Sequence, residues 1–230
     1  MKLSIHQPQY IPWLPYFLKI EESDRFIFLD TVDFQKNGLQ NRNQIKTGQG
    51  AQWLTVPVQQ KLGQKIGDTP IQNTTDWRRK HWQTLQQCYG KLDGFRVHAE
   101  ELEALFAREW DNLSDLNITL TLAMMRWLGI ETPTVRSSEM SAKGAASDLV
   151  LNLCTEAGAS EYISGTGGRD YLRLDDFERA GVRVDFRPTP AIDPYAQAFP
   201  KAGFVNHLSA LDILFNCGGG WRQHVPALND

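Results

Sequence analysis

The first part of the chain alternates apolar and polar positions in a way that predicts two strands joined by a helix. Residues 2–6 are β-prone, and residues 16–22 place Tyr16, Phe17 and Ile20 at helical spacing. The run RFIFLD at residues 25–30 predicts the second strand. A strand, a helix and a strand in this order form a βαβ unit, whose right-handed crossover requires parallel strands. The opening of the chain therefore predicts a parallel sheet.

The middle of the chain predicts a layer of helices. Thr75 can cap a helix that runs to about residue 89 and stops at Gly90, and two more helices are predicted over residues 99–110 and 114–128. The third is apolar around nearly its whole circumference, so we expect it to be buried. Residues 75–129 therefore predict an inserted helical layer. Before it, residues 31–47 lack periodicity and predict a long polar loop, followed by a strand over residues 53–58.

The last part of the chain returns to alternating elements. The pattern predicts extended structure at 134–136, a helix at 147–157, strands at 160–164 and 182–186, and helices at 175–180 and 209–215. Such alternation is typical of a layered α/β fold. We therefore expect an α/β fold of nucleotide-binding type, with helices on both faces of a parallel or mixed sheet. We expect one domain over residues 1–230, with the helical insertion at about 75–129.

Composition narrows the possible partners. Hydrophobic residues make up 41% of the chain and charged residues 22%, which is enough for a large core. The net charge of -3 provides no field that would hold nucleic acid, so we expect no such partner. No run approaches the ~20 apolar residues of a membrane span, and we expect a cytoplasmic protein without membrane insertion. The oligomeric state stays open.

The cysteines do not point to a metal site or to a disulfide framework. Cys88, Cys154 and Cys217 lie far apart, and none belongs to a CxxC motif or has a histidine at zinc-site spacing. The sequence therefore implies no metal ion and no tightly bound cofactor.

The loop that follows the first predicted strand, HQPQYIPWLPYF, carries the first candidate site. Ligands of open α/β sheets bind beyond the carboxyl ends of the strands. The prolines stiffen this loop, so it can present His6, Gln7 and Tyr10 in fixed positions. We expect His6 to act as a catalytic acid or base, because its pKa lies near neutrality, and Gln7 and Tyr10 to contact substrate. The alternative is that the prolines shape a turn over packed aromatic rings, with His6 bonded to a strand end.

The second candidate loop, SGTGGR, follows the strand at 160–164. Glycines let backbone N–H groups approach an anion, hydroxyls add further donors, and arginine binds phosphate in bidentate fashion. The predicted phosphate-binding residues are Ser164, Gly165, Thr166, Gly168 and Arg169. The motif lacks the GK[ST] ending of a Walker sequence. The alternative is a tight turn that needs a positive φ at one of its glycines.

Two further polar groups are candidates for substrate binding. Asn41, Arg42 and Asn43 combine amides, which donate and accept hydrogen bonds, with a cation that binds anions. Loop capping is the competing explanation for them. His81 follows three consecutive cations and could also contact substrate. A charged helix face with a half-buried histidine is the alternative there.

Five motifs, in this order, give the chain a family resemblance. They are HQPQYIPWLPYFLKI, NRNQIKTGQGAQWLTVPV, WRRKHWQTLQQCYGKLDGF, YISGTGGRDYL and HLSALDILFNCG, and together they resemble the WbqC-like protein family over almost the whole chain. Members of that family are associated with bacterial surface-polysaccharide gene clusters, especially those for O-antigen, so the resemblance implies that setting. The family pattern W-L-G-Y-F has a glycine where this chain has Pro15, so the chain departs from the family at that position, and whether Pro15 alters the site stays open.

A weaker similarity concerns nucleotidyltransferase-like α/β proteins, which place a histidine-bearing loop after the first strand and a Ser-Thr-Arg loop late in the chain. The HxGH spacing of those proteins is absent here. With the two candidate loops, these resemblances predict a transferase that acts on a nucleotide-activated sugar or glycan precursor by acyl, aminoacyl or nucleotidyl transfer. The alternative is a non-catalytic protein of the same pathway that binds a nucleotide sugar or serves as a scaffold.

Overall fold

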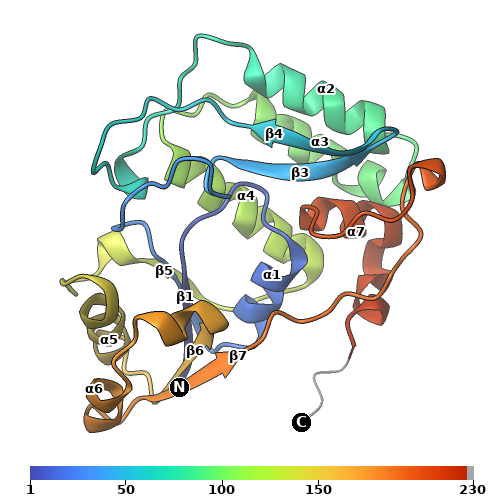
Figure 1. Ribbon diagram of the computed structural model, residues 1–230. Helices are drawn as coiled ribbons and strands as arrows, with labels where there is room; N and C mark the ends of the chain where they lie inside the picture. The colour runs from blue at the N-terminus through green and yellow to red at the C-terminus, as the bar shows by residue number, and fades with distance from the viewer. Residues whose placement is uncertain (227–230) are drawn as a thin grey trace.

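The computed structural model describes residues 1–226 and contains a five-stranded parallel sheet, whose strands lie in the lower half of Figure 1. The strands stand in the order β5-β2-β1-β6-β7. Their bounds are β1 Lys2–His6, β2 Arg25–Phe28, β5 Thr134–Arg136, β6 Glu161–Gly165 and β7 Arg183–Arg187. All four neighbouring pairs are parallel. The sequence prediction of a parallel α/β sheet is thus confirmed.

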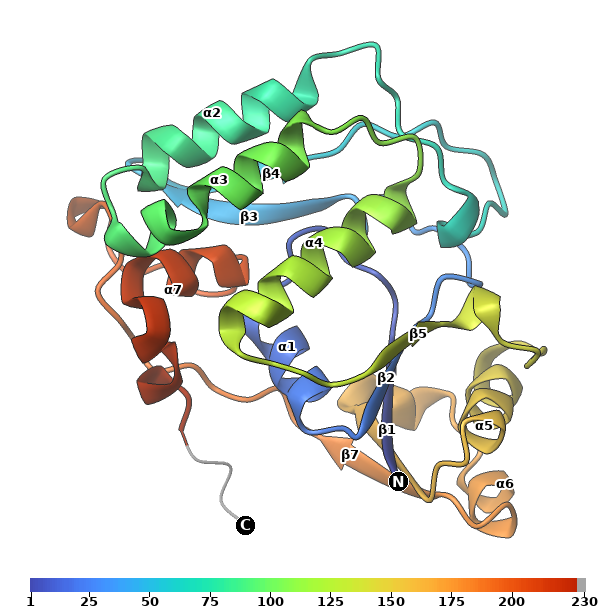
Figure 2. The same ribbon diagram turned by 180° about the vertical axis from the view of Figure 1, so that it is seen from behind.

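Helices cover both faces of this sheet. Phe26 and Phe28 of β2 belong to the apolar cluster that contains α1 (Leu14–Glu21) and α4 (Leu113–Leu128). Ile27, between them, belongs to the cluster with α5 (Ala146–Glu156) and α6 (Leu174–Arg179). Successive side chains of a strand point to opposite faces, so these clusters are the two interfaces of a three-layer α/β fold. Figure 2 shows α5 and α6 on one side of the sheet and α1 on the other.

A long insertion connects β2 to β5. It contains an antiparallel hairpin, β3 (Arg42–Thr47) with β4 (Gly50–Thr55), followed by α2 (Trp77–Tyr89), α3 (Asp93–Ala107) and α4. The last helix, α7 (Ala210–Cys217), contacts α3, where the rings of Phe95 and Phe215 lie 5.1 Å apart between their centroids. Short 3-10 turns lie at Ile66–Asp68, Ser137–Glu139, Thr166–Asp170, Pro200–Ala202 and Gly218–His224. The predicted helices within 75–129 are therefore present.

The prediction of a continuous loop over residues 31–47 is wrong, because residues 42–47 form β3. Asn43, Ile45 and Lys46 are buried there, and two of the three are polar. Asn43 donates to the carbonyl oxygen of Ile11 at 2.9 Å, and the backbone N–H of Lys46 donates to the hydroxyl of Tyr89 at 2.9 Å. Buried polar residues that find hydrogen-bond partners hide the apolar alternation that marks a strand.

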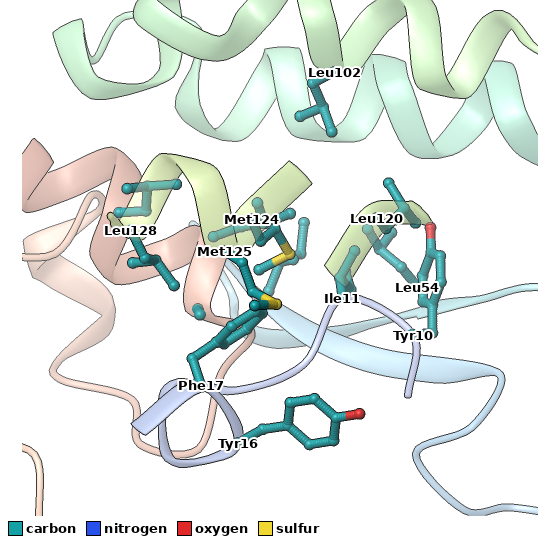
Figure 3. Packing of buried hydrophobic residues seen from close by; sticks show 14 of the residues in the cluster. Tyr10, Ile11, Tyr16, Phe17, Leu54, Leu102, Leu120, Met124, Met125 and Leu128 are labelled. Atoms are coloured by element: carbon teal, nitrogen blue, oxygen red, sulfur yellow. The ribbon is translucent and has the colours of Figure 1, made fainter. Parts of the chain in front are cut away.

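The helix α4 lies between the sheet and the inserted hairpin, as its apolar circumference predicts. The side chain of Asn112 caps its first turn by accepting from the N–H groups of Ser114 and Asp115, and Gly129 ends it with φ of 72°. In Figure 3 the side chains of Leu120 and Met124 lie beside Ile11 of the loop after β1. This loop is therefore part of the core.

The helices of residues 1–226 are all too short or too polar to cross a membrane.

Candidate functional site

A cavity of about 730 Å³ opens at the carboxyl ends of β1 and β6. The chain leaves β1 through α1 toward β2 on one side, whereas β6 lies on the other side of β1 and continues to β7. Connections that leave neighbouring strands in opposite directions form the crevice in which doubly wound sheets bind ligands. The lining includes His6, Gln7, Lys19, Glu22, Ser164, Gly165, Gly168 and Arg187.

The imidazole of His6 is uncharged at neutral pH. Burial, and secondarily the charge of Lys19, lower the pKa of His6 from 6.5 to about 4. Its Nδ1 lies 3.1 Å from the carbonyl oxygen of Gln7. Since a carbonyl only accepts hydrogen bonds, Nδ1 carries the proton and Nε2 carries the lone pair. The ring of Tyr16 lies edge-on, with 5.0 Å between the ring centroids. His6 can therefore accept a proton at Nε2.

The amine of Lys19 is the second notable group of the cavity. Its Nζ donates to the carbonyl oxygen of Ile5 at 2.9 Å, and burial lowers its pKa from 10.5 to about 8. None of the ion pairs within residues 1–226 includes Lys19. The cavity wall thus holds a partly desolvated cation that has no carboxylate partner in the described chain.

The opposite charge is also present on the cavity wall. Glu22, the C-cap residue of α1, lies about one turn after Lys19, and its Oε2 is 4.0 Å from Nε of Arg187. Arg187 itself pairs more closely with Asp185, at 2.8 Å. Burial raises the pKa of Glu22, with Arg187 acting in the opposite direction.

The glycine turn after β6 closes the cavity from the other side. Ser164 is buried and donates from Oγ to the carbonyl oxygen of Gly165 at 3.1 Å. A Cβ atom at Gly168 would lie 2.2 Å from Oγ of Ser164, whereas nothing lies within 4 Å of a Cβ at Gly165 or Gly167. None of these three glycines has a positive φ. The turn therefore does not depend on a positive φ at any of these glycines. Gly168 is required because a side chain there would clash with Ser164.

Two residues of the predicted phosphate loop do not line the cavity. Thr166 is exposed on the 3-10 turn, and Arg169 is also exposed, with its guanidinium carbon 4.4 Å from the ring centroid of Phe186. Cation–π stacking occupies the Arg169 side chain in this arrangement.

The polar cluster at residues 41–43 lies outside the cavity lining and holds the fold together. Asn43 donates to the carbonyl oxygens of Ile11 and Tyr10, at 2.9 and 3.3 Å. Asn41 donates to the carbonyl oxygen of Val56 at 2.9 Å. Arg42 donates to the carbonyl oxygen of Asn37 at 2.6 Å and stacks over the ring of an exposed tryptophan. In this structure all three side chains donate to backbone carbonyl oxygens.

Tyr10 and His81 bind each other in the core rather than at the cavity. The hydroxyl of Tyr10 lies 2.8 Å from Nδ1 of His81, and both side chains are buried. Burial lowers the pKa of His81 to about 4. Neither residue is part of the cavity lining.

Gln7 connects the cavity to the insertion. Its Oε1 accepts from Nε2 of Gln40 at 2.8 Å, and its carbonyl oxygen accepts from the hydroxyl of Tyr16 at 3.2 Å. The backbone carbonyl of Gln40 in turn accepts from Asn117 of α4 at 2.7 Å. These bonds fix the loop that follows His6.

Sequence reasoning missed Lys19, Glu22 and Arg187. The signal for Lys19 was a single cation between Leu18 and Ile20 in a helix that must pack against the sheet. For Arg187, the signal was its position at the carboxyl end of a predicted strand.

The fold and the cavity define a doubly wound α/β protein with a cavity at its topological switch point. Within this class, the chain belongs to the WbqC-like protein family, whose family model matches residues 7–223. The matched region includes every residue of the cavity lining named above except His6.

One relative comes from Mycobacterium tuberculosis and bears the name "Uncharacterized protein Rv1507c". It is 38% identical over 220 residues, which cover 94% of each chain. No solved structure matches the chain.

Proposed function

We propose that this protein is a group transferase whose switch-point cavity binds a phosphate-bearing, nucleotide-activated substrate, such as a nucleotide sugar. The observation that carries the proposal is the Lys19 ammonium, which lines the cavity next to an uncharged His6 and has no ion-pair partner within residues 1–226. A desolvated cation without a protein partner is stabilised by an anionic ligand. The role in surface-polysaccharide biosynthesis is proposed from the family resemblance.

The dimensions and the walls of the cavity support a small organic substrate. Its volume of about 730 Å³ is typical of small-molecule sites, which span roughly 300–1,000 Å³. Trp13, Tyr16 and Tyr162 supply apolar wall area, and the glycine turn after β6 supplies backbone at the opposite side. Such walls suit a molecule with a flat or apolar part and a charged part.

In the proposed reaction, His6 accepts a proton and Lys19 stabilises negative charge. A hydroxyl or amine of the acceptor attacks the carbonyl carbon or phosphorus of the donor, and its proton passes to Nε2 of His6. The bond between that carbon or phosphorus and the leaving group then breaks, and the leaving group takes the electron pair. Lys19 stabilises the negative charge that develops on the phosphate or carboxylate oxygen. Acyl, aminoacyl and nucleotidyl transfer all follow this scheme.

Thermal unfolding of the purified protein with a panel of nucleotide sugars, and with the matching nucleosides, tests the proposal. A ligand at 100 times its Kd stabilises by ~2.7 kcal/mol, which should raise the Tm of a domain of this size by roughly 5 to 11 °C. We expect such a shift with at least one nucleotide sugar and none with its nucleoside.

Turnover of the ligand found in this way distinguishes an enzyme from a binding protein. We expect His6→Ala to lower kcat by roughly 100-fold or more, while His98→Ala, which lies outside the cavity lining, retains activity. Binding without turnover would favour the non-catalytic alternative. A panel in which no phosphate-bearing ligand shifts the Tm would contradict the proposal.

A further inference from the structure

Glu22, the C-cap residue of α1, lies about one turn after Lys19 on the same side, and both side chains line the cavity. Residues three apart on a helix start about 5–6 Å apart at their Cβ atoms. No ion pair within residues 1–226 joins these two side chains, although their charges are opposite. The cavity wall therefore presents a separate cationic end and a separate anionic end.

The carboxylate of Glu22 lacks a hydrogen-bond donor in the described chain. Its nearest cation, Nε of Arg187, lies 4.0 Å away, beyond hydrogen-bond distance. Arg187 is engaged by Asp185 at 2.8 Å. Asp185 thus takes the closer contact with Arg187, and the Glu22 carboxylate, which also lies in the field of Lys2, has no hydrogen-bonded cation within residues 1–226.

The neighbouring Glu21, by contrast, has hydrogen-bond donors for both carboxylate oxygens. Both of its oxygens accept from the guanidinium of Arg222, one of them at 3.0 Å. Glu21 does not line the cavity. Of the two carboxylates, the one without a hydrogen-bond donor, that of Glu22, is thus the one that lines the cavity.

We infer that Glu22 binds an amino group of the substrate, so that the site takes a molecule carrying both an amine and a phosphate a few ångström apart, such as an amino-sugar phosphate. This inference rests on the proposed function, which assigns the phosphate to Lys19. An ammonium supplies three hydrogen-bond donors and an opposite charge for the Glu22 carboxylate, which lies 4.0 Å from its only ion-pair partner within residues 1–226. A neutral hydroxyl would supply a donor but no opposite charge.

Isothermal titration with glucosamine 1-phosphate and glucose 1-phosphate tests the inference. The two probes share the phosphate and differ in the amine, so their ratio of affinities reports on the amine alone. We expect the wild-type protein to prefer glucosamine 1-phosphate on the order of 10-fold, as a charge-assisted hydrogen bond provides. Glu22→Gln should remove the preference by weakening the binding of glucosamine 1-phosphate. Glu21→Gln is the matched control and should keep the preference.

Each result separates this inference from the proposed function. If the wild-type protein binds both sugars with equal affinity, the inference is wrong and phosphate binding stands. A preference that survives in Glu22→Gln would place the amine elsewhere and would also overturn it. If neither sugar phosphate binds at millimolar concentration, both the phosphate site and the amine site are refuted. The comparison of the two sugar phosphates uses the wild-type protein alone, so it does not depend on whether a variant folds.

Discussion

The Lys19 side chain donates from Nζ to the carbonyl oxygen of Ile5 at 2.9 Å, which ties the first helix to the strand just before His6. Lysine side chains are long and lose much rotamer entropy when fixed, so this bond holds the charge in one place. The consequence is a positioned cation at the switch point of the sheet.

Replacement of Lys19 by methionine should weaken phosphate binding by about 10-fold or more, because it removes a charge-assisted bond while keeping the length of the side chain. Titration with inorganic pyrophosphate measures this effect. Lys36→Met, at an exposed loop position, is the control and should bind as the wild type does. If Lys19→Met binds pyrophosphate as tightly as the wild type, the Lys19 amine does not contact the phosphate.

The same affinity should depend on pH. Since the pKa of Lys19 is lowered to about 8, the amine is charged below this value and loses its proton as the pH rises through it. We expect pyrophosphate binding to weaken between pH 7 and pH 9 in the wild type. In Lys19→Met the dependence over this range should be smaller, and an identical profile in both proteins would argue against the assignment.

Gly168→Ala should destabilise the fold by about 1–3 kcal/mol, because the new Cβ would lie 2.2 Å from Oγ of Ser164 and 3.0 Å from a methyl carbon of Leu172. Urea unfolding monitored by circular dichroism measures the change. Gly167→Ala is the control, since nothing lies within 4 Å of its Cβ and its φ is not positive. Equal stabilities of the two variants would show that the turn packs differently.

Acid should destabilise the protein partly through His81. Its pKa is about 4 in the folded state and 6.5 when exposed, so the unfolded chain binds a proton first as the pH falls. The stability from the neutral ring is complete above pH 6.5 and is lost as the pH falls from 6.5 toward 4. From pH 7 to pH 5, this histidine accounts for about 2 kcal/mol. His81→Gln should lose that much less in urea unfolding over the same range, and an equal loss would contradict the assignment.

Periodicity predicts most of the fold because most elements bury an apolar stripe. The parallel strands at 2–6 and 25–30 and the buried helix at 114–128 were all readable in this way. The strand β3 was not, because Asn43 and Lys46, on its opposite faces, are buried polar residues whose side-chain partners come from distant segments. A polar position does not reveal from the sequence whether it faces solvent or a buried hydrogen-bond partner.

The candidate site was predictable to the extent that it depends on strand ends. His6 and Ser164 lie at the carboxyl ends of strands that the topology places side by side, so the loops after them meet at the cavity. The positions of Tyr10 and His81 in the core depend on the insertion, whose packing the sequence does not encode locally. Lys19 reaches the cavity because of the rotation of α1 on the sheet, which is set by tertiary packing.

The pKa of His6, measured by NMR with and without inorganic pyrophosphate, tests the central claim most directly, because His6 lines the cavity and His81 is an internal control outside it. Both start with a pKa of about 4. A phosphate charge a few ångström away stabilises the imidazolium, and at an effective dielectric constant near 20 the interaction amounts to a few kcal/mol. We predict that saturating pyrophosphate raises the pKa of His6 by about 1 or more and leaves that of His81 unchanged. If the pKa of His6 stays the same, or if both rise together, the cavity at the ends of β1 and β6 is not the phosphate site.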